Sequence, residues 1–103
     1  MRLSHQEVHC IVRLIKLRDS EAKVYLFGSR VNDQLRGGDI DLLVISSVIE
    51  FGDKIDILSE LKAELGDQKI DLTLCDPHRV SEDDFARNAV NSGVELTGIN
   101  PFA

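Results

Sequence analysis

Two aspartates at the start of one apolar segment have a spacing that lets their side chains act together. Asp39 and Asp41 are two residues apart in residues 39–46, a run typical of a β-strand. Side chains at positions i and i+2 of a strand project from the same face. Leu43 and Ile45 continue that row, so the pattern indicates a covered apolar face with two carboxylates at its entrance.

A third aspartate stands in the corresponding place on another apolar segment. Asp71 belongs to residues 69–75, and it joins Asp39 and Asp41 if the two strands pair with their rows aligned. Three such carboxylates repel one another, and protonation or a bound cation relieves the repulsion. Oxygen ligands favour a hard ion such as Mg²⁺. From these residues alone, exposed strand ends that bind nothing are an equally good interpretation.

A glycine-serine pair supplies groups that suit phosphate. Gly28 and Ser29 follow the short apolar run at residues 23–27, where a strand passes into a turn. Such a turn leaves backbone N–H groups and a hydroxyl free to bind phosphate oxygens. On its own the pair is most often just a turn. Together with Asp39 and Asp41 it supplies both parts of a metal–triphosphate site, so we expect nucleotide to bind weakly without a divalent cation.

The elements that must position these residues can be read from local patterns. Ser4 and Glu7 have the spacing of a capping box, which starts a helix, and Ser81 with Asp84 is interpreted as the cap of the last helix. In chain order we expect a helix over 4–19, strands over 23–27 and 39–46, a helix over 52–65, a strand over 69–75, a helix over 81–91 and a tail over 94–97. This order favours an α+β or α/β fold.

Composition narrows the class of protein. The chain has 103 residues, for which we expect one domain spanning residues 1–103. Twelve Lys and Arg against 18 Asp and Glu give a net charge of −6, which opposes non-specific binding to nucleic acid. Residues 1–19 have neither a signal-peptide pattern nor a membrane span, so we expect a cytoplasmic protein. Cys10 and Cys75 are expected to be buried free thiols.

Residues 28–44, with Gly-Ser, a loop and then Asp-x-Asp entering a strand, resemble the signature of the minimal nucleotidyltransferases. These belong to the DNA polymerase beta-like nucleotidyltransferase superfamily. The strand before the motif, the helix after it and Asp71 follow in the family's order. The resemblance implies an α+β fold with a small mixed β-sheet flanked by helices. The loop departs from the family pattern at residues 31–33 and at Gly38.

The resemblance also implies a reaction and a role for each residue. The reaction is a two-metal transfer of a nucleoside monophosphate from a triphosphate such as ATP to a hydroxyl. Asp39 and Asp41 would hold two Mg²⁺ ions, and Asp71 would bind the ion nearest the acceptor. Gly28 and Ser29 would hold the leaving phosphates. Arg30 in the following loop would add a positive charge, although a solvated loop residue is an equally good interpretation.

The acceptor is expected to come from elsewhere, because 103 residues are too few to include an acceptor-binding domain. Relatives of this type are commonly paired with a HEPN-domain ribonuclease toxin, as an antitoxin that transfers AMP from ATP to a toxin tyrosine. The resemblance therefore implies such a partner. Two alternatives remain open: an antitoxin that neutralises its partner only by covering it, and transfer to a small molecule or an RNA end.

Overall fold

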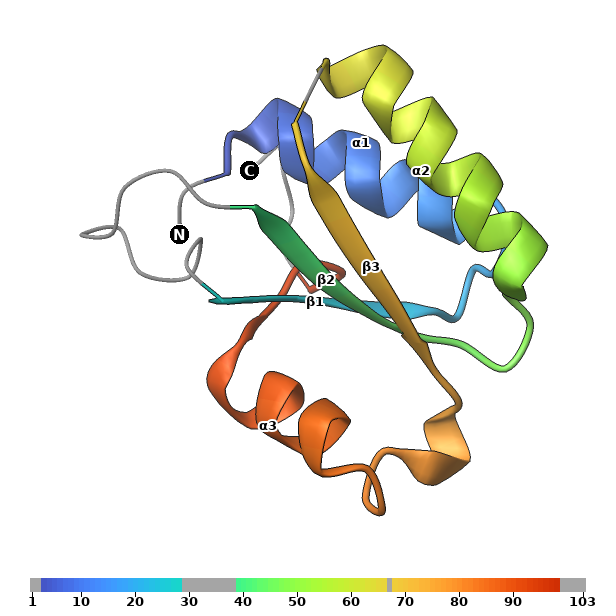
Figure 1. Cartoon of the computed structure of the whole chain (residues 1–103), viewed down its shortest axis with the longest axis vertical. Helices are drawn as coiled ribbons and strands as arrows, with labels where there is room; N and C mark the ends of the chain where they lie inside the picture. Colours follow the sequence, from blue (N-terminus) through green and yellow to red (C-terminus); the bar gives the residue numbers. More distant parts are fainter. Residues whose placement is uncertain (1–2, 29–38, 67, 99–103) are drawn as a thin grey trace.

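The structure is a computed structural model that describes residues 3–28, 39–66 and 68–98 (Figure 1). The elements in these ranges are α1 (His5–Lys16), β1 (Lys23–Phe27), β2 (Ile40–Ile45), α2 (Phe51–Leu65), β3 (Ile70–Cys75), the 3₁₀ helix η2 (Pro77–Arg79), α3 (Asp84–Ser92) and β4 (Val94–Glu95). None of the helices in the described ranges is long and apolar enough to cross a membrane.

The four strands form one mixed sheet in the order β3-β2-β1-β4. β1 is antiparallel to both of its neighbours, β2 and β4, whereas β2 and β3 are parallel. The parallel pair needs a crossover connection, which α2 supplies. The expected α+β class with a small mixed sheet flanked by helices is therefore confirmed.

Helices cover both faces of the sheet, with α1 and α2 on one side and α3 on the other (Figure 1). Alternate residues of the strands therefore enter two different clusters. In β2, Leu42 and Val44 pack in the larger cluster with α1 and α2, whereas Leu43 packs with Ala86 and Ala89 of α3. Both cysteines are buried free thiols, as expected.

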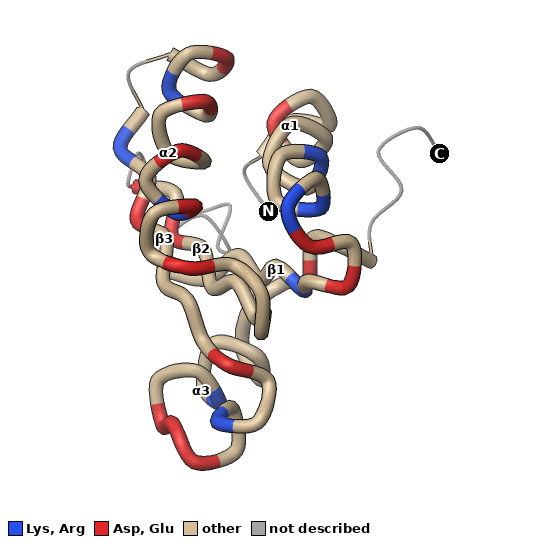
Figure 2. The backbone as a smooth tube through the Cα atoms, turned by 90° about the vertical axis from the view of Figure 1, so that its right-hand side faces the viewer, with Lys and Arg blue, Asp and Glu red and all other residues tan. Residues whose placement is uncertain are grey.

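Polar contacts join α1 to α2, which lie side by side (Figure 2). The Arg13 guanidinium contacts both carboxylate oxygens of Glu64 at 2.7 and 2.8 Å, and Arg18 pairs with Glu60 at 3.2 Å. The Cys10 thiol donates to Glu64 at 2.7 Å. Burial, and then the Glu64 carboxylate, raise the pKa of Cys10 to about 12, so the thiol stays protonated. Arg13 of α1 and Arg18, which follows α1, thus both bind α2.

The helix starts agree with the sequence in one case and differ in another. The Ser4 hydroxyl accepts from the Glu7 backbone N–H at 3.1 Å and the Glu7 carboxylate accepts from the Ser4 N–H at 3.0 Å, so the capping box is confirmed. The cap predicted at Ser81 is wrong. Asp83 caps α3, and its carboxylate accepts from Ala86 N–H at 3.1 Å. Ser81 lies in the turn that follows η2, so the helix begins later.

A buried hydroxyl organises the connection from β2 to α2. Ser46 donates to the Asp19 carboxylate at 2.6 Å, and its oxygen accepts from the backbone N–H groups of Val48 and Ile49 at 3.1 and 3.0 Å. The first helix was predicted to end near Asp19 but ends at Lys16. The residues after Lys16 therefore bring the Asp19 carboxylate to the end of β2.

We expect Ser46→Ala to lower the free energy of unfolding by about 1–3 kcal/mol, because the substitution strands two backbone donors and a carboxylate. Urea unfolding measures the change. The matched control is Ser47→Ala at the exposed neighbouring position, for which we expect a change within about 0.5 kcal/mol. Equal effects of the two substitutions would contradict the role given to the Ser46 hydroxyl.

Candidate active site

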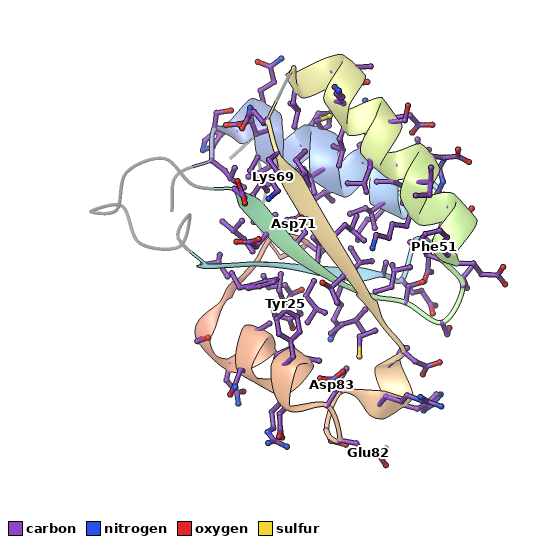
Figure 3. All side chains as sticks on the ribbon, in the orientation of Figure 1. Tyr25, Phe51, Lys69, Asp71, Glu82 and Asp83 are labelled. Carbon is purple, nitrogen blue, oxygen red and sulfur yellow. The ribbon has the colours of Figure 1, made fainter. Side chains whose placement is uncertain are left out.

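Strand register brings two of the predicted aspartates together. The parallel pairing of β2 with β3 places Asp41 opposite Asp71 and Leu43 opposite Thr73. Residues paired in this way project from the same face, here the face that α3 covers further along the strands. Asp41 is half-buried on the inner strand, and Asp71 is exposed on the edge strand β3 (Figure 3). The residue row that contains Asp41 in β2 is therefore aligned with the row that contains Asp71 in β3.

Asp39, the third aspartate, has a basic neighbour. It lies just before β2, and its Oδ2 is 3.4 Å from Nζ of Lys69. The backbone fixes this approach, since the N–H of Ile40 donates to the carbonyl of Lys69 at 3.0 Å. Sequence reasoning placed Lys69 in the row with Asp71 but gave it no role. The ion pair is largely exposed, so its contribution to stability is small.

The electrostatics of Asp41 favour a cation at this edge of the sheet. Burial raises the pKa of Asp41 above its ordinary value, and the negative charges of Asp71 and Asp39 raise it further. The Lys69 ammonium acts in the opposite direction but does not cancel these effects. The donors are carboxylate oxygens, the ligands preferred by hard divalent ions, so the residues present fit Mg²⁺.

The described residues contain no group of three His, Cys, Asp or Glu side chains already placed to hold a metal ion. Asp41 and Asp71 are neighbours, whereas Asp39 is paired with Lys69. Metal binding by the three aspartates therefore stays a prediction.

Gly28 adjoins the same carboxylate. Its φ is +79°, in the region that L side chains rarely adopt. A Cβ atom at this position would also collide with Oδ2 of Asp41. Only glycine therefore lets the turn after β1 approach Asp41 this closely. Ser29 and Arg30, the other predicted phosphate-binding residues, lie outside the described residues.

An aromatic pair beside the aspartates was not identified from the sequence. Phe27 is the register partner of Asp41 across β1 and β2, and its ring meets that of Phe85 from α3 with 5.1 Å between centroids and 85° between planes. The available signal was the position of Phe27 directly before Gly28. No local pattern links Phe85 to it.

A separate cavity of about 320 Å³ lies at the other end of the same face. Its lining residues are Glu21, Lys23, Tyr25, Ile45, Pro77, Val80 and Val90. Lys23 pairs with Ile45 at the end of the strands opposite to the Phe27–Asp41 pair. The cavity is therefore distinct from the carboxylate site.

The fold and the site together define a class of protein. Carboxylates on adjacent parallel strands, beside a glycine turn at the end of an antiparallel strand, form an anionic edge suited to divalent metal and phosphate. The family profile described as "Polymerase beta, Nucleotidyltransferase" matches residues 10–101. The chain belongs to this nucleotidyltransferase family.

Other comparisons agree on the fold. One chain of the crystal structure of the toxin–antitoxin MntA–HpeT, a mutant in which two aspartates are replaced by glutamate, matches with a TM-score of 0.66 and 21% sequence identity. The match covers 95% of this chain and 75% of that chain. At this identity the likeness shows the shared fold. No curated protein matches the chain.

We expect Asp41→Asn to raise the thermal unfolding midpoint of the metal-free protein at neutral pH. Because the pKa of Asp41 is raised in the folded state, its ionised form destabilises the fold above that pKa, and this penalty disappears as the pH falls through it. The gain from the neutral amide should therefore shrink on acidification.

Differential scanning calorimetry between neutral pH and about pH 4, with a chelator present, measures this gain. Asp56→Asn, which removes an exposed carboxylate from α2, is the matched control and should show no such gain. A variant at Asp41 that is less stable than wild type at neutral pH would contradict the electrostatic account.

Proposed function

We propose that this protein is a Mg²⁺-dependent nucleotidyltransferase that transfers AMP from ATP to a tyrosine hydroxyl of a partner protein. The partner would be a HEPN-domain ribonuclease toxin, and this chain would be its antitoxin. One observation carries the proposal: Asp41 lies between Asp71 and the Gly28 turn in a chain of the nucleotidyltransferase family. Such a transfer needs carboxylates that hold metal ions beside backbone groups that bind phosphate.

In the proposed reaction the acceptor hydroxyl releases its proton to water, and its oxygen forms a bond to the α-phosphorus of ATP. The bond from that phosphorus to the bridging oxygen of the β-phosphate breaks, and pyrophosphate leaves with the electron pair. Asp39, Asp41 and Asp71 would hold two Mg²⁺ ions, which when bound supply stabilisation of the negative charge that develops on the phosphate oxygens.

Asp71, Asp41 and Gly28 have separate roles in the proposed reaction. Asp71 is exposed on the edge strand, so a hydroxyl that approaches from solvent reaches this carboxylate first and donates its hydrogen bond to it. Asp41 is more buried and lies between Asp71 and Gly28. The absence of a side chain at Gly28 lets the turn after β1 lie against Asp41, so that phosphate bound to the backbone of this turn would lie beside the carboxylates.

The assignment of a partner is supported by two facts. The MntA–HpeT structure that shares this fold is a toxin–antitoxin. The chain also carries a net charge of −6, which is complementary to the basic surface expected of a protein that binds RNA.

We expect a nucleotide-sized increase in the intact mass of the partner after co-expression with the wild-type chain, and no increase with Asp41→Asn. The partner is the protein encoded beside this chain, and mass spectrometry makes the measurement. Asp56→Asn is the matched control and should modify the partner as wild type does. A mass increase that survives Asp41→Asn would contradict the proposed role of the carboxylates.

Transfer to a small molecule or an RNA end is an alternative to transfer to the partner protein. The mass measurement, together with a measurement of pyrophosphate release, distinguishes the two. This alternative predicts ATP consumption and pyrophosphate release when a small molecule or RNA is supplied as acceptor without the partner protein, and no change in the mass of the partner. We therefore measure pyrophosphate release with and without the partner.

A second candidate function is a binding module that neutralises its partner by covering it. Exposed apolar residues at the start of α2 favour this candidate: Val48, Phe51 and Ile55 are 57%, 68% and 50% exposed. Phe51 and Ile55 are four residues apart on one helix and therefore adjacent on its surface. We call these three residues the α2 patch, and Phe51 lies away from Asp71 (Figure 3). Exposed apolar patches of this kind often mark interfaces.

If the α2 patch contacts the partner, we expect the double substitution Phe51→Ser and Ile55→Ser to weaken the complex at least tenfold, because two apolar anchors are lost. Calorimetric titration with the purified partner measures the affinity. Ala63→Ser, at an exposed position two turns along α2, is the control and should leave it unchanged. Asp41→Asn should also leave it unchanged, so that binding and transfer are separated.

A further inference from the structure

The aromatic pair lies in line with the aspartates across three adjacent strands. Asp71 is on β3, Asp41 faces it from β2, and Phe27 faces Asp41 from β1. Directly opposed residues of an antiparallel pair have Cβ atoms about 4.5–5.5 Å apart and share a face. The ring of Phe27 therefore borders the Asp41 carboxylate, and Phe85 borders Phe27 with 5.1 Å between ring centroids.

Phe85 is exposed, whereas the next residue of α3, Ala86, is buried. Ala86 and Ala89 bury the inner side of α3 against Leu43 and Cys75, whereas Phe85 remains 48% exposed. Its edge-to-face contact with Phe27 fixes the ring orientation. A large flat apolar surface thus stays open to solvent beside the acidic edge.

We propose that Phe85 is the stacking platform for the base of the nucleotide, an inference that rests on the proposed function. Phosphates at the Gly28 turn place the attached ribose and base over the end of β1, and Phe27 and Phe85 occupy that end of the face. Every nucleobase has a π-face, so an aromatic side chain binds it without reading its hydrogen-bonding edge.

The geometry favours the nucleotide base, rather than an aromatic ring of the acceptor, as the group that stacks on Phe85. The acceptor hydroxyl approaches at Asp71, on the edge strand β3, whereas the aromatic pair borders β1, two strands away. The nucleotide and the acceptor thus occupy opposite sides of Asp41. A tyrosine ring stacked on Phe85 would hold its hydroxyl on the nucleotide side of the site.

The test compares two ligands that differ in the base and ribose. Mg²⁺·ATP and Mg²⁺·tripolyphosphate are titrated into wild type and into Phe85→Ala, Phe85→Leu and Phe85→Tyr by calorimetry. We expect Phe85→Ala and Phe85→Leu to weaken ATP binding by about five- to hundredfold and to leave tripolyphosphate binding unchanged. Phe85→Tyr, which keeps a ring, should bind ATP within about twofold of wild type.

Several results would overturn the inference. Phe85→Ala and Phe85→Leu could bind ATP as wild type does, or they could lose ATP and tripolyphosphate equally, which would indicate general damage to the site. An unchanged affinity for ATP together with weaker binding of the partner would assign Phe85 to the acceptor. Phe85→Leu keeps the apolar volume, and its thermal unfolding reports whether the variant is folded.

A different result is expected if the proposed function itself is wrong. Wild type would then bind neither ATP nor tripolyphosphate in Mg²⁺, and both proposals would fall. If wild type binds ATP and modifies its partner while Phe85→Leu does so equally well, only the stacking platform is wrong.

Discussion

The parallel pairing of β2 with β3 is the constraint on which the site depends. It places Asp41 and Asp71 side by side, which like charges alone would oppose. The apolar residues on the other face hold the pairing, because Leu42 and Leu72 are register partners buried under α1 and α2. A slip of one residue would turn Asp71 into that core and expose Leu72. The hydrophobic core thus fixes the position of the charges.

The electrostatic cost of placing these carboxylates together falls mainly on the ionised form of Asp41. Its pKa is raised because burial and two neighbouring carboxylates disfavour the charged form, and Lys69 offsets only part of this. Other polar groups of the chain are better satisfied, as at Ser46, whose hydroxyl is buried but makes three hydrogen bonds. An incompletely compensated charge beside a glycine that cannot be substituted without a clash is typical of a binding site rather than of a structural feature.

Local patterns predicted the parts of the fold that depend on neighbours in the sequence. The capping box at Ser4 and the strand that precedes Gly28 both follow from short-range rules. The sequence predicts which residues of each strand share a face with Asp41 or with Asp71. It does not predict that the two strands pair with these residues aligned, because register depends on contacts between distant segments. The Phe27–Phe85 contact was missed for the same reason.

The order of residues across the sheet links binding to turnover. Because β3 is an edge strand, Asp71 is open to solvent, whereas Asp41 between two strands is shielded and Phe27 adjoins α3. α3 packs through the small side chains Ala86 and Ala89 over Leu43, and its Phe85 contacts Phe27, the register partner of Asp41. Under the proposed function, a nucleotide that enters from the β1 side and an acceptor that enters from the β3 side would meet at Asp41. A partner would then approach the edge strand without displacing the nucleotide.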